Sequence, residues 1–257
     1  MESLVLVRQE GASRILSLNR PDVRNALSQG LQVALGGALE QAINDPKTRS
    51  IVITGEGKAF CAGLDLSELQ AIRERSSEEN RADSARFAAL LERIYTSPKP
   101  CIAAVNGHAV AGGAGIASVC DLVVMNENAK IGYTESKIGF VAALVAVFLS
   151  RIVGEKHCRD LLLTGRLISA QEAQDIGLVN EVCPPDQVLG RALDLANVLN
   201  SNAPTSLAMS KQLLAALPSM GLREGLNYAS EVNALARSTD NLREGISAFL
   251  EKRSPSY

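Results

Sequence analysis

The stretch from Cys101 to Asp121, CIAAVNGHAVAGGAGIASVCD, constrains what this chain can fold into more than any other part of it. It opens with five small or apolar residues, continues with the turn signal Asn106-Gly107, and reaches a second apolar run through the glycine-rich bend 111–115. This order predicts a buried strand, a tight turn and a helix that begins in the bend. Free N–H groups and the helix dipole at such a start favour a phosphate or a developing oxyanion.

The glycine-rich bend by itself leaves two interpretations open, ligand binding and ordinary close packing. It matches neither the G-x-x-x-x-G-K-[ST] pattern nor, in register, G-x-G-x-x-G followed by an acidic residue. The sequence therefore argues against a nucleotide-phosphate cradle of either kind.

The composition bounds the possible partners. The 257 residues suffice for one large domain with or without a small appendage, and 46% of them are apolar, enough for a sizeable core. A net charge of −2 and only 4% aromatic residues give no reason to expect nucleic acid or an anionic membrane. Five cysteines without metal-type spacing and only two histidines argue against a zinc site.

The N-terminus and the cysteines together predict the compartment. The segment MESLVLVRQEG has neither the basic start and apolar core of a signal peptide nor the character of a transit peptide. The longest uncharged apolar stretch, 138–150, is too short to cross a bilayer. Cysteines spread through apolar runs are typical of buried, reduced thiols. We therefore expect a soluble cytoplasmic protein.

Strands alternate with helices in the early part of the chain, and helices alone fill the last third. Ser28 is the expected N-cap of the first helix. The pattern predicts an α/β core with a helical C-terminal subdomain. The apolar periodicity predicts strands at 3–8, 14–19, 50–54, from near Val119 to Met125, and 180–183, and helices at 28–43, 84–96, 143–153, 155–163, 170–176 and throughout the segment after 186.

A second stretch of small residues, Lys58-Ala-Phe-Cys-Ala-Gly-Leu-Asp-Leu66, lies about fifty residues before the glycine-rich bend. The mixed-charge region 67–86 that follows it is expected to be a solvated helix and loop. The pair formed by 58–66 and Asn106-Gly-His-Ala-Val-Ala-Gly-Gly-Ala-Gly115 resembles the paired signatures of the crotonase superfamily, the enoyl-CoA hydratases and isomerases. Further matching segments occur in the same order over essentially the whole chain: 19–27 (NRPDVRNAL), 163–166, 170–173, 177–180 and 247–253 (SAFLEKR).

The resemblance implies a spiral of ββα units with a helical trimerisation region, assembled as a trimer or a dimer of trimers. It implies a core at 1–195 that holds an acyl-CoA site, and a C-terminal region at 196–257 for oligomerisation and closure of that site. Two backbone N–H groups would bind the thioester oxygen, and by position they fall on Leu64 and Gly112. Proton transfer alpha to a thioester places negative charge on that oxygen, and preorganised N–H donors stabilise it.

The substrate implied by the resemblance is an acyl-CoA thioester, and no separate cofactor is expected because CoA is part of that substrate. Arg24 and Lys252 could meet the CoA phosphates. In the family, the C-terminal Phe and Lys often come from a neighbouring subunit. The substrate-binding positions implied are Arg24, Ala26, Ala62, Asp65, Leu66, Gly113, Phe249 and Lys252.

The sequence departs from the family's hydratases at one of two glutamates. The second glutamate matches Glu135, but the position of the first is Gly115. A single carboxylate suits a 1,3-proton shift in a β,γ-enoyl thioester, and it works best with a pKa raised toward the working pH. Hydration stays an alternative, with water and Glu135 sharing the work or another acid reaching in. A second departure is the segment 139–144, where many members have a Pro-Gly-Ala-Gly-Gly run.

Other functions remain open at this point. His108 and His157 lack a G-x-S-x-G nucleophile elbow and are expected to be a loop histidine and an exposed helical histidine. The superfamily includes RNA-binding members, so a non-catalytic RNA-binding protein is one rival. Thioester hydrolysis, carbon–carbon cleavage and methylglutaconyl-CoA hydration are others that keep the oxyanion hole.

Overall fold

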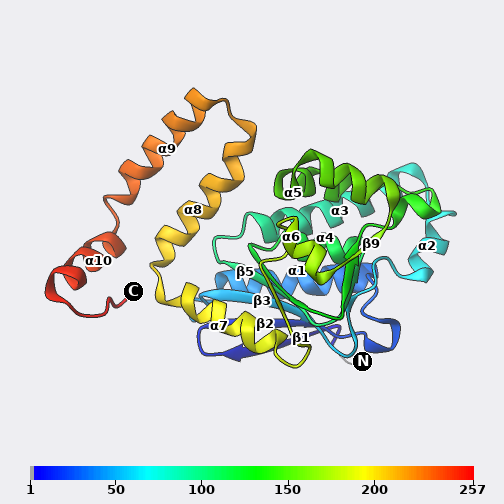
Figure 1. The fold of residues 1–257 in the computed structure, drawn as a ribbon, viewed down its shortest axis with the longest axis horizontal. Helices are drawn as coiled ribbons and strands as arrows, with labels where there is room; N and C mark the ends of the chain where they lie inside the picture. Colours follow the sequence, from blue (N-terminus) through cyan, green and yellow to red (C-terminus); the bar gives the residue numbers. More distant parts are fainter. Residues whose placement is uncertain (1–2) are drawn as a thin grey trace.

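The computed structural model describes residues 3–257, and its core is built on a six-stranded sheet (Figure 1). The strand order is β1-β2-β3-β5-β7-β10, and every neighbouring pair is parallel except β1 with β2. The strands are β1 (Val5–Glu10), β2 (Ser13–Leu18), β3 (Ser50–Gly55), β5 (Cys101–Val105), β7 (Leu122–Asn126) and β10 (Glu181–Cys183).

A second, four-stranded sheet crosses the end of the first and has the order β4-β6-β8-β9. After each of three large-sheet strands the chain enters this small sheet and then a helix: β3 leads to β4, β5 to β6, and β7 to β8. The predicted spiral of ββα units is therefore confirmed. Its members are β4 (Ala59–Cys61), β6 (His108–Val110), β8 (Lys130–Gly132) and β9 (Leu167–Ser169).

Helices cover both faces of the large sheet, which is why its strands read as continuous apolar runs. Ile51 and Ile53 of β3 join the core on the side of α1 (Gln29–Asn44), while Val52 between them joins the core under α7 (Val188–Ser201). The predicted Ser28 cap of α1 is confirmed, because the Ser28 side chain accepts a hydrogen bond from the Leu31 N–H. The remaining core helices are α2 (Leu66–Ile72), α3 (Ser77–Tyr95), α4 (Gly112–Ser118), α5 (Ala143–Thr164) and α6 (Ala170–Asp175).

The structure corrects several element boundaries. The α3 helix begins at Ser77 rather than at 84, because Ser76 and Glu79 form a reciprocal capping box. The two helices expected at 143–153 and 155–163 are confirmed as the two halves of α5, which is interrupted at Gly154, where φ is 74° and the backbone is not helical. The strand expected from near Val119 begins only at Leu122, because α4 runs to Ser118.

Beyond the sheet the chain leaves the core as an arm of three helices, α8 (Pro204–Ala216), α9 (Leu222–Ala236) and α10 (Asp240–Glu251). Figure 1 shows the arm beside the core, with α10 at its far end. The predicted division at 195/196 falls inside α7, which packs on the sheet, and the arm begins after Ser201. No helix within residues 3–257 combines the length and apolar content needed to cross a membrane.

One ion pair, between a buried lysine and a partly exposed aspartate side chain, fastens the arm to the core. The Lys211 ammonium group on α8 lies 2.6 Å from the Asp121 carboxylate and also donates to the Lys99 carbonyl oxygen at 3.1 Å. The Asp121 carboxylate also accepts from the Cys101 N–H, at the start of β5. Burial raises the pKa of Asp121, and the positive charge of Lys211 opposes this effect by stabilising the ionised carboxylate.

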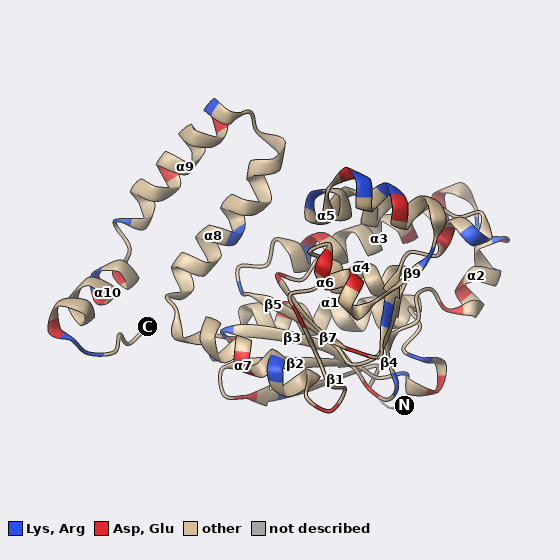
Figure 2. Ribbon diagram, viewed as in Figure 1, with Lys and Arg blue, Asp and Glu red and all other residues tan. Residues whose placement is uncertain are grey.

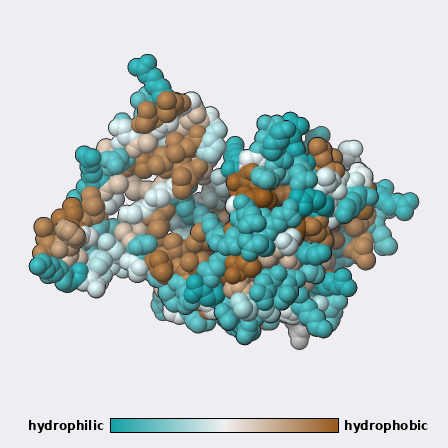
Figure 3. Space-filling model, viewed as in Figure 1, coloured by the Kyte–Doolittle hydropathy of each residue, from teal (hydrophilic) through white to brown (hydrophobic). Residues whose placement is uncertain are grey.

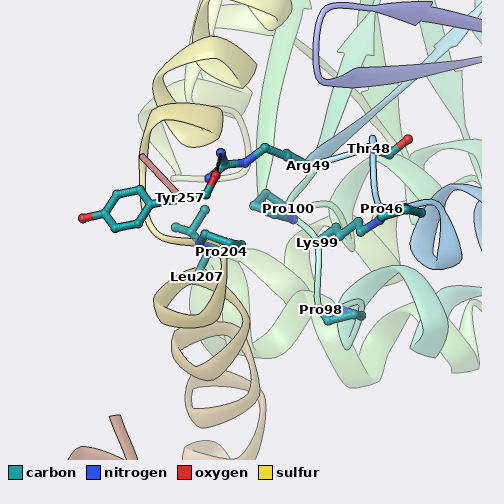
Figure 4. A pocket seen from close by; sticks show the side chains of 9 residues that line it. All are labelled: Pro46, Thr48, Arg49, Pro98, Lys99, Pro100, Pro204, Leu207 and Tyr257. Atoms are coloured by element: carbon teal, nitrogen blue, oxygen red, sulfur yellow. Dashed lines mark hydrogen bonds between the residues drawn. The ribbon is translucent and has the colours of Figure 1, made fainter. Parts of the chain in front are cut away.

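A cavity of about 300 Å³ opens at the root of the arm, where the start of α8 meets the core (Figure 4). Arg49 projects beside it and donates to the Asn202 and Tyr257 carbonyl oxygens. This cavity contains none of the predicted site residues, so we assign it to the junction of arm and core. It is lined by Pro46, Thr48, Arg49, Pro98, Lys99, Pro100, Pro204, Leu207 and Tyr257.

Replacing Lys211 by Met is expected to lower the free energy of unfolding by about 1–3 kcal/mol, because it leaves the Asp121 carboxylate without its cation. Chemical denaturation would measure the change. The double variant Lys211→Met/Asp121→Asn is the matched control, because a neutral amide oxygen can still accept from the Cys101 N–H. Recovery of stability in the double variant is expected, and equal destabilisation of both variants would show that the ion pair is not the cause.

Candidate active site

The loop 20–27 holds the first site residues beside the start of β4, the first strand of the small sheet. The Asn25 side chain accepts from the Arg20 N–H and donates to the Glu56 and Ala59 carbonyl oxygens. Both Arg24 and Asn25 have φ near 54°, a left-handed conformation that these bonds hold in place. Ala26 is buried, whereas Arg24 is exposed at the surface of the loop.

The backbone around Leu64 leaves one N–H free. A parallel bridge joins Leu27 to Leu64, in which the Leu27 N–H donates to the Gly63 carbonyl and the Asp65 N–H donates to the Leu27 carbonyl. This pattern skips the Leu64 N–H, which has no acceptor within residues 3–257. Gly63 has φ of +89°, a conformation that side chains other than glycine's rarely adopt, and it turns the following peptide outward.

A second free N–H belongs to Gly112. As the first residue of α4 it has no intrahelical acceptor, and the part of the chain that the structure describes offers it none elsewhere. The preceding residue, Ala111, has φ of 50° and ψ of −121°, and its N–H is bound by the Gly132 carbonyl. A strained alanine at a helix start is a reason to look for function there.

The two free donors lie on adjacent backbone segments. A Cβ added to Gly63 would stand 3.0 Å from the Ala111 Cβ and 3.0 Å from the Val110 oxygen. The residues directly before Leu64 and Gly112 are therefore in van der Waals contact. A Cβ on Gly113 would stand 2.4 Å from the Cys61 oxygen, so only glycine permits this approach of α4 to β4.

Aliphatic and aromatic side chains surround α4 on the side of these donors. An added Cβ on Gly112 would lie 2.9 Å from Leu27 Cδ1 and 3.2 Å from Phe87 Cζ, and one on Gly115 would lie 2.8 Å from Val145 Cγ2. The sequence interpretation missed these neighbours, because they come from separate parts of the chain. Leu27 lies in the loop before α1, Phe87 on α3 and Val145 on α5. The signal was present for α3, where Phe87 and Leu91 are one helical turn apart and face Gly112 and Gly115 respectively.

Glu135 opens the short helix η2 (Glu135–Ile138), and its side chain is buried. Its Oε2 atom has no hydrogen-bond partner within residues 3–257. Burial raises the pKa of this carboxyl, because the loss of solvation of the charged form outweighs the hydrogen bond from the Glu135 backbone N–H. A buried carboxyl group with one unpartnered oxygen and a raised pKa is typical of a general acid or base.

A clamp connects α4 to the segment that carries Glu135. The Tyr133 hydroxyl is hydrogen-bonded to Ser118 Oγ, which donates to the Ala114 carbonyl inside α4. The Ala111 N–H bound by Gly132 is a second connection between the same two segments. The position of the Gly112 donor relative to Glu135 is thereby fixed by buried contacts at both ends of α4.

The other predicted substrate-binding residues fall into two groups. Ala62 and Leu66 lie beside Leu64 in sequence, and the Ala62 N–H donates to the Arg24 carbonyl. Asp65 caps α2 by accepting from the Ser67 N–H, and it pairs with Arg20 at 2.8 Å, so its carboxylate holds the backbone that presents Leu64.

Phe249 and Lys252 lie on the arm and do not reach the site of the same chain. Phe249 is 83% exposed on α10, and Lys252 is the left-handed C-cap of that helix. In Figure 1, α10 stands at the end of the arm, across the molecule from α2. Their predicted contact with substrate would therefore need a second copy of the chain.

Other reactive side chains do not assemble into a centre. His108 lies on β6, where a loop was expected, and its Nδ1 accepts from the Lys130 N–H. His157 is exposed on α5. Cys61 is buried, and burial raises the pKa of its thiol to about 12. Among residues 3–257 no three His, Cys, Asp or Glu side chains gather as metal ligands would.

Comparisons with known proteins identify the family of the chain. The family model described as "Enoyl-CoA hydratase/isomerase" matches residues 9–257. A "putative enoyl-CoA hydratase" of Thermus thermophilus is 53% identical over 97% of this chain and 98% of its own length. The "2,3-dehydroadipyl-CoA hydratase" of Escherichia coli is 37% identical over 100% of this chain and 99% of its own.

Solved structures give the same result for the fold. The crystal structure of an enoyl-CoA hydratase from Polaromonas superposes with a TM-score of 0.94 at 38% identity, over 98% of this chain and 99% of that one. An enoyl-CoA hydratase from Bacillus anthracis superposes with a TM-score of 0.92 at 32% identity, over 99% of this chain and 98% of that one.

Proposed function

We propose that this chain, which belongs to the enoyl-CoA hydratase/isomerase family, moves the double bond of an enoyl-CoA thioester by proton transfer through Glu135. The observation that supports this most is the buried Glu135 carboxyl group, whose Oε2 atom has no hydrogen-bond partner within residues 3–257 and whose pKa is raised by burial. The free Leu64 and Gly112 N–H groups supply the second requirement, a pair of oxyanion donors.

The proposed step needs only one carboxylate. Ionised Glu135 takes the proton on the carbon alpha to the thioester of a β,γ-enoyl substrate, and the electron pair spreads into a dienolate. The negative charge collects on the thioester oxygen, where the two N–H donors stabilise it. Protonated Glu135 then returns the proton at the gamma carbon, giving the α,β-enoyl thioester and regenerating the carboxylate.

Hydration of an α,β-enoyl thioester is the second candidate, and the printed names of the Thermus and E. coli relatives favour it. It requires OH and H to be delivered to neighbouring carbons, which two polar groups do more easily than one. In this chain the position next to α5 carries Gly115 against Val145, so Glu135 and water would have to share both transfers. Scoring a panel of enoyl-CoA isomers for hydration and for double-bond migration separates the two reactions.

An RNA-binding role has less support. Figure 2 shows acidic and basic residues interspersed along the same helices. Just after α10, for example, Arg253 pairs with both Glu244 and Glu251 of that helix. A nucleic-acid surface needs unpaired basic side chains gathered on one face.

We propose further that copies of the chain assemble through the arm, as a trimer or a dimer of trimers, and that Phe249 and Lys252 then approach a neighbour's CoA. Figure 3 shows hydrophobic side chains gathered on the arm. Contiguous exposed apolar surface of this kind marks an interaction site. The exposed large apolar residues of the arm are Leu214, Leu222, Leu226, Leu235, Leu242, Ile246, Phe249 and Leu250.

A CoA thioester is expected to raise the melting temperature. Ligand at about 100 times its Kd adds roughly 2.7 kcal/mol to the free energy of unfolding, because it binds only the folded site. Differential scanning fluorimetry with acetyl-CoA would measure the shift, and adenosine alone serves as the control. Absence of any shift with short or long acyl-CoA at millimolar concentration would contradict the proposed substrate class.

A further inference from the structure

We infer that Val145 excludes a second polar group from this site and so disfavours hydration, by filling with a methyl group the place beside Gly115 of α4 where that polar group would have to stand. This inference rests on the proposed function, since it concerns the partition between double-bond migration and hydration. The evidence is the packing around Gly115 in the middle of α4.

Gly115 has no room for a side chain. A Cβ built there would stand 2.8 Å from Val145 Cγ2, which is closer than non-bonded carbon atoms approach, and 4.0 Å from Leu91 Cδ2. Val145 is only 2% exposed and sits in the first turn of α5, and Leu91 is fully buried. The Val145 side chain does not rotate out of this space, because a valine in a helix is held at one strongly preferred rotamer.

The contact belongs to the proposed acyl site rather than to a remote part of the core. Gly115 lies one turn of α4 after the Gly112 donor, so both face the same side of that helix. Phe87 and Leu91, one turn apart on α3, pack against this pair of glycines. The α5 helix that carries Val145 follows directly after the η2 segment that begins with Glu135.

The chemical consequence is that the side chains packed against α4 at Gly115 present only carbon atoms. A water molecule needs two to four polar partners to be held, and the Val145 and Leu91 methyl groups supply none. Water attack would therefore depend on Glu135 alone, which must also deliver the proton. Double-bond migration has no such conflict, because the same carboxylate removes the proton and then returns it.

The test is a set of four proteins: wild type, Val145→Ala, Gly115→Glu and the double variant Gly115→Glu/Val145→Ala. Each is assayed for hydration of a 2-enoyl-CoA and for migration of the double bond in a 3-enoyl-CoA. We expect Val145→Ala to keep the wild-type ratio of hydration to migration, because it adds space without a polar group. Gly115→Glu alone should lose both activities, while the double variant should raise the ratio by about 10²-fold, the lower end for a positioned acid or base.

Two results would overturn the inference. One is a folded double variant with the wild-type ratio, and the other is Gly115→Glu alone raising the ratio as much as the double variant does. A wild type inactive on every enoyl-CoA would instead count against the proposed function itself.

A thermal-unfolding cycle of Gly115→Ala and Val145→Ala tests the contact without any activity. Gly115→Ala should be destabilised in the wild-type background and less so when Val145 is Ala. Additive effects would show that the two residues do not compete for one space.

Discussion

Glu135→Gln is expected to lower kcat by about 10²–10⁴-fold, the usual contribution of a positioned general acid or base. The amide keeps the shape of the carboxyl group but cannot take up or return the proton. The Kd of CoA esters should stay nearly unchanged, because the proposed oxyanion donors are backbone groups of Leu64 and Gly112. Steady-state turnover and a separate binding titration give the two numbers.

The pH dependence supplies an independent signature of the same residue. The base must be ionised, so kcat/KM should rise with pH through the pKa of Glu135, and burial places that limb above the range of an ordinary glutamate. The stability effect has the opposite sign: a raised pKa in the folded state means that stability is fully present at low pH and falls as pH rises through that pKa. In Glu135→Gln both effects should vanish.

A different pattern would redirect the mechanism. Brisk hydration of crotonyl-CoA by the wild type, with Glu135→Gln equally active, would point to another acid. Loss of CoA-ester binding in Glu135→Gln would show that the residue acts in binding rather than in proton transfer.

Gly112→Pro is expected to cost about 10²–10³-fold in kcat, the effect of deleting one oxyanion donor. Proline has no N–H, and it is tolerated at the first position of a helix, which Gly112 occupies in α4. However, any side chain here presses on Leu27 Cδ1 at 2.9 Å and on Phe87 Cζ at 3.2 Å. A loss of activity in the proline variant alone would therefore be ambiguous.

Gly112→Ala is the matched control, since it introduces the same crowding but keeps the N–H. The kcat ratio of the alanine to the proline variant isolates the donor, and circular dichroism must show both to be folded. Equal turnover by the two variants would remove Gly112 from the oxyanion hole, whatever each loses relative to wild type.

The sequence predicted the α/β class and most elements because their signals are local. Ser28 ahead of an apolar repeat caps α1 as expected, and the segment 50–54, with three apolar residues at its centre, is a strand covered on both faces. The elements that the sequence analysis placed wrongly also have local causes. The three-residue strand β6 is too short to show periodicity, and the start of α3 depends on a reciprocal cap in a charged segment.

The family resemblance of 58–66 and 106–115 named Leu64, Gly112 and Glu135, but it said nothing of the space around them. The order of residues cannot show that the Leu64 N–H is skipped by a bridge to Leu27, or that Ala111 is held in a strained conformation. Both depend on which segments meet, and these are separated by dozens of residues.

The sequence by itself determined the chemistry that is available: glycine and alanine where backbone must come close, and Glu135 without a second glutamate at Gly115. Only the tertiary structure decided what occupies the vacant position, because α5 folds back so that Val145 packs against Gly115. Composition and periodicity describe the type of each residue. The free-energy cost of placing a polar group or a larger side chain at a given position depends on the atoms that surround that position. Those atoms come from α3 and α5, and folding alone brings them to α4.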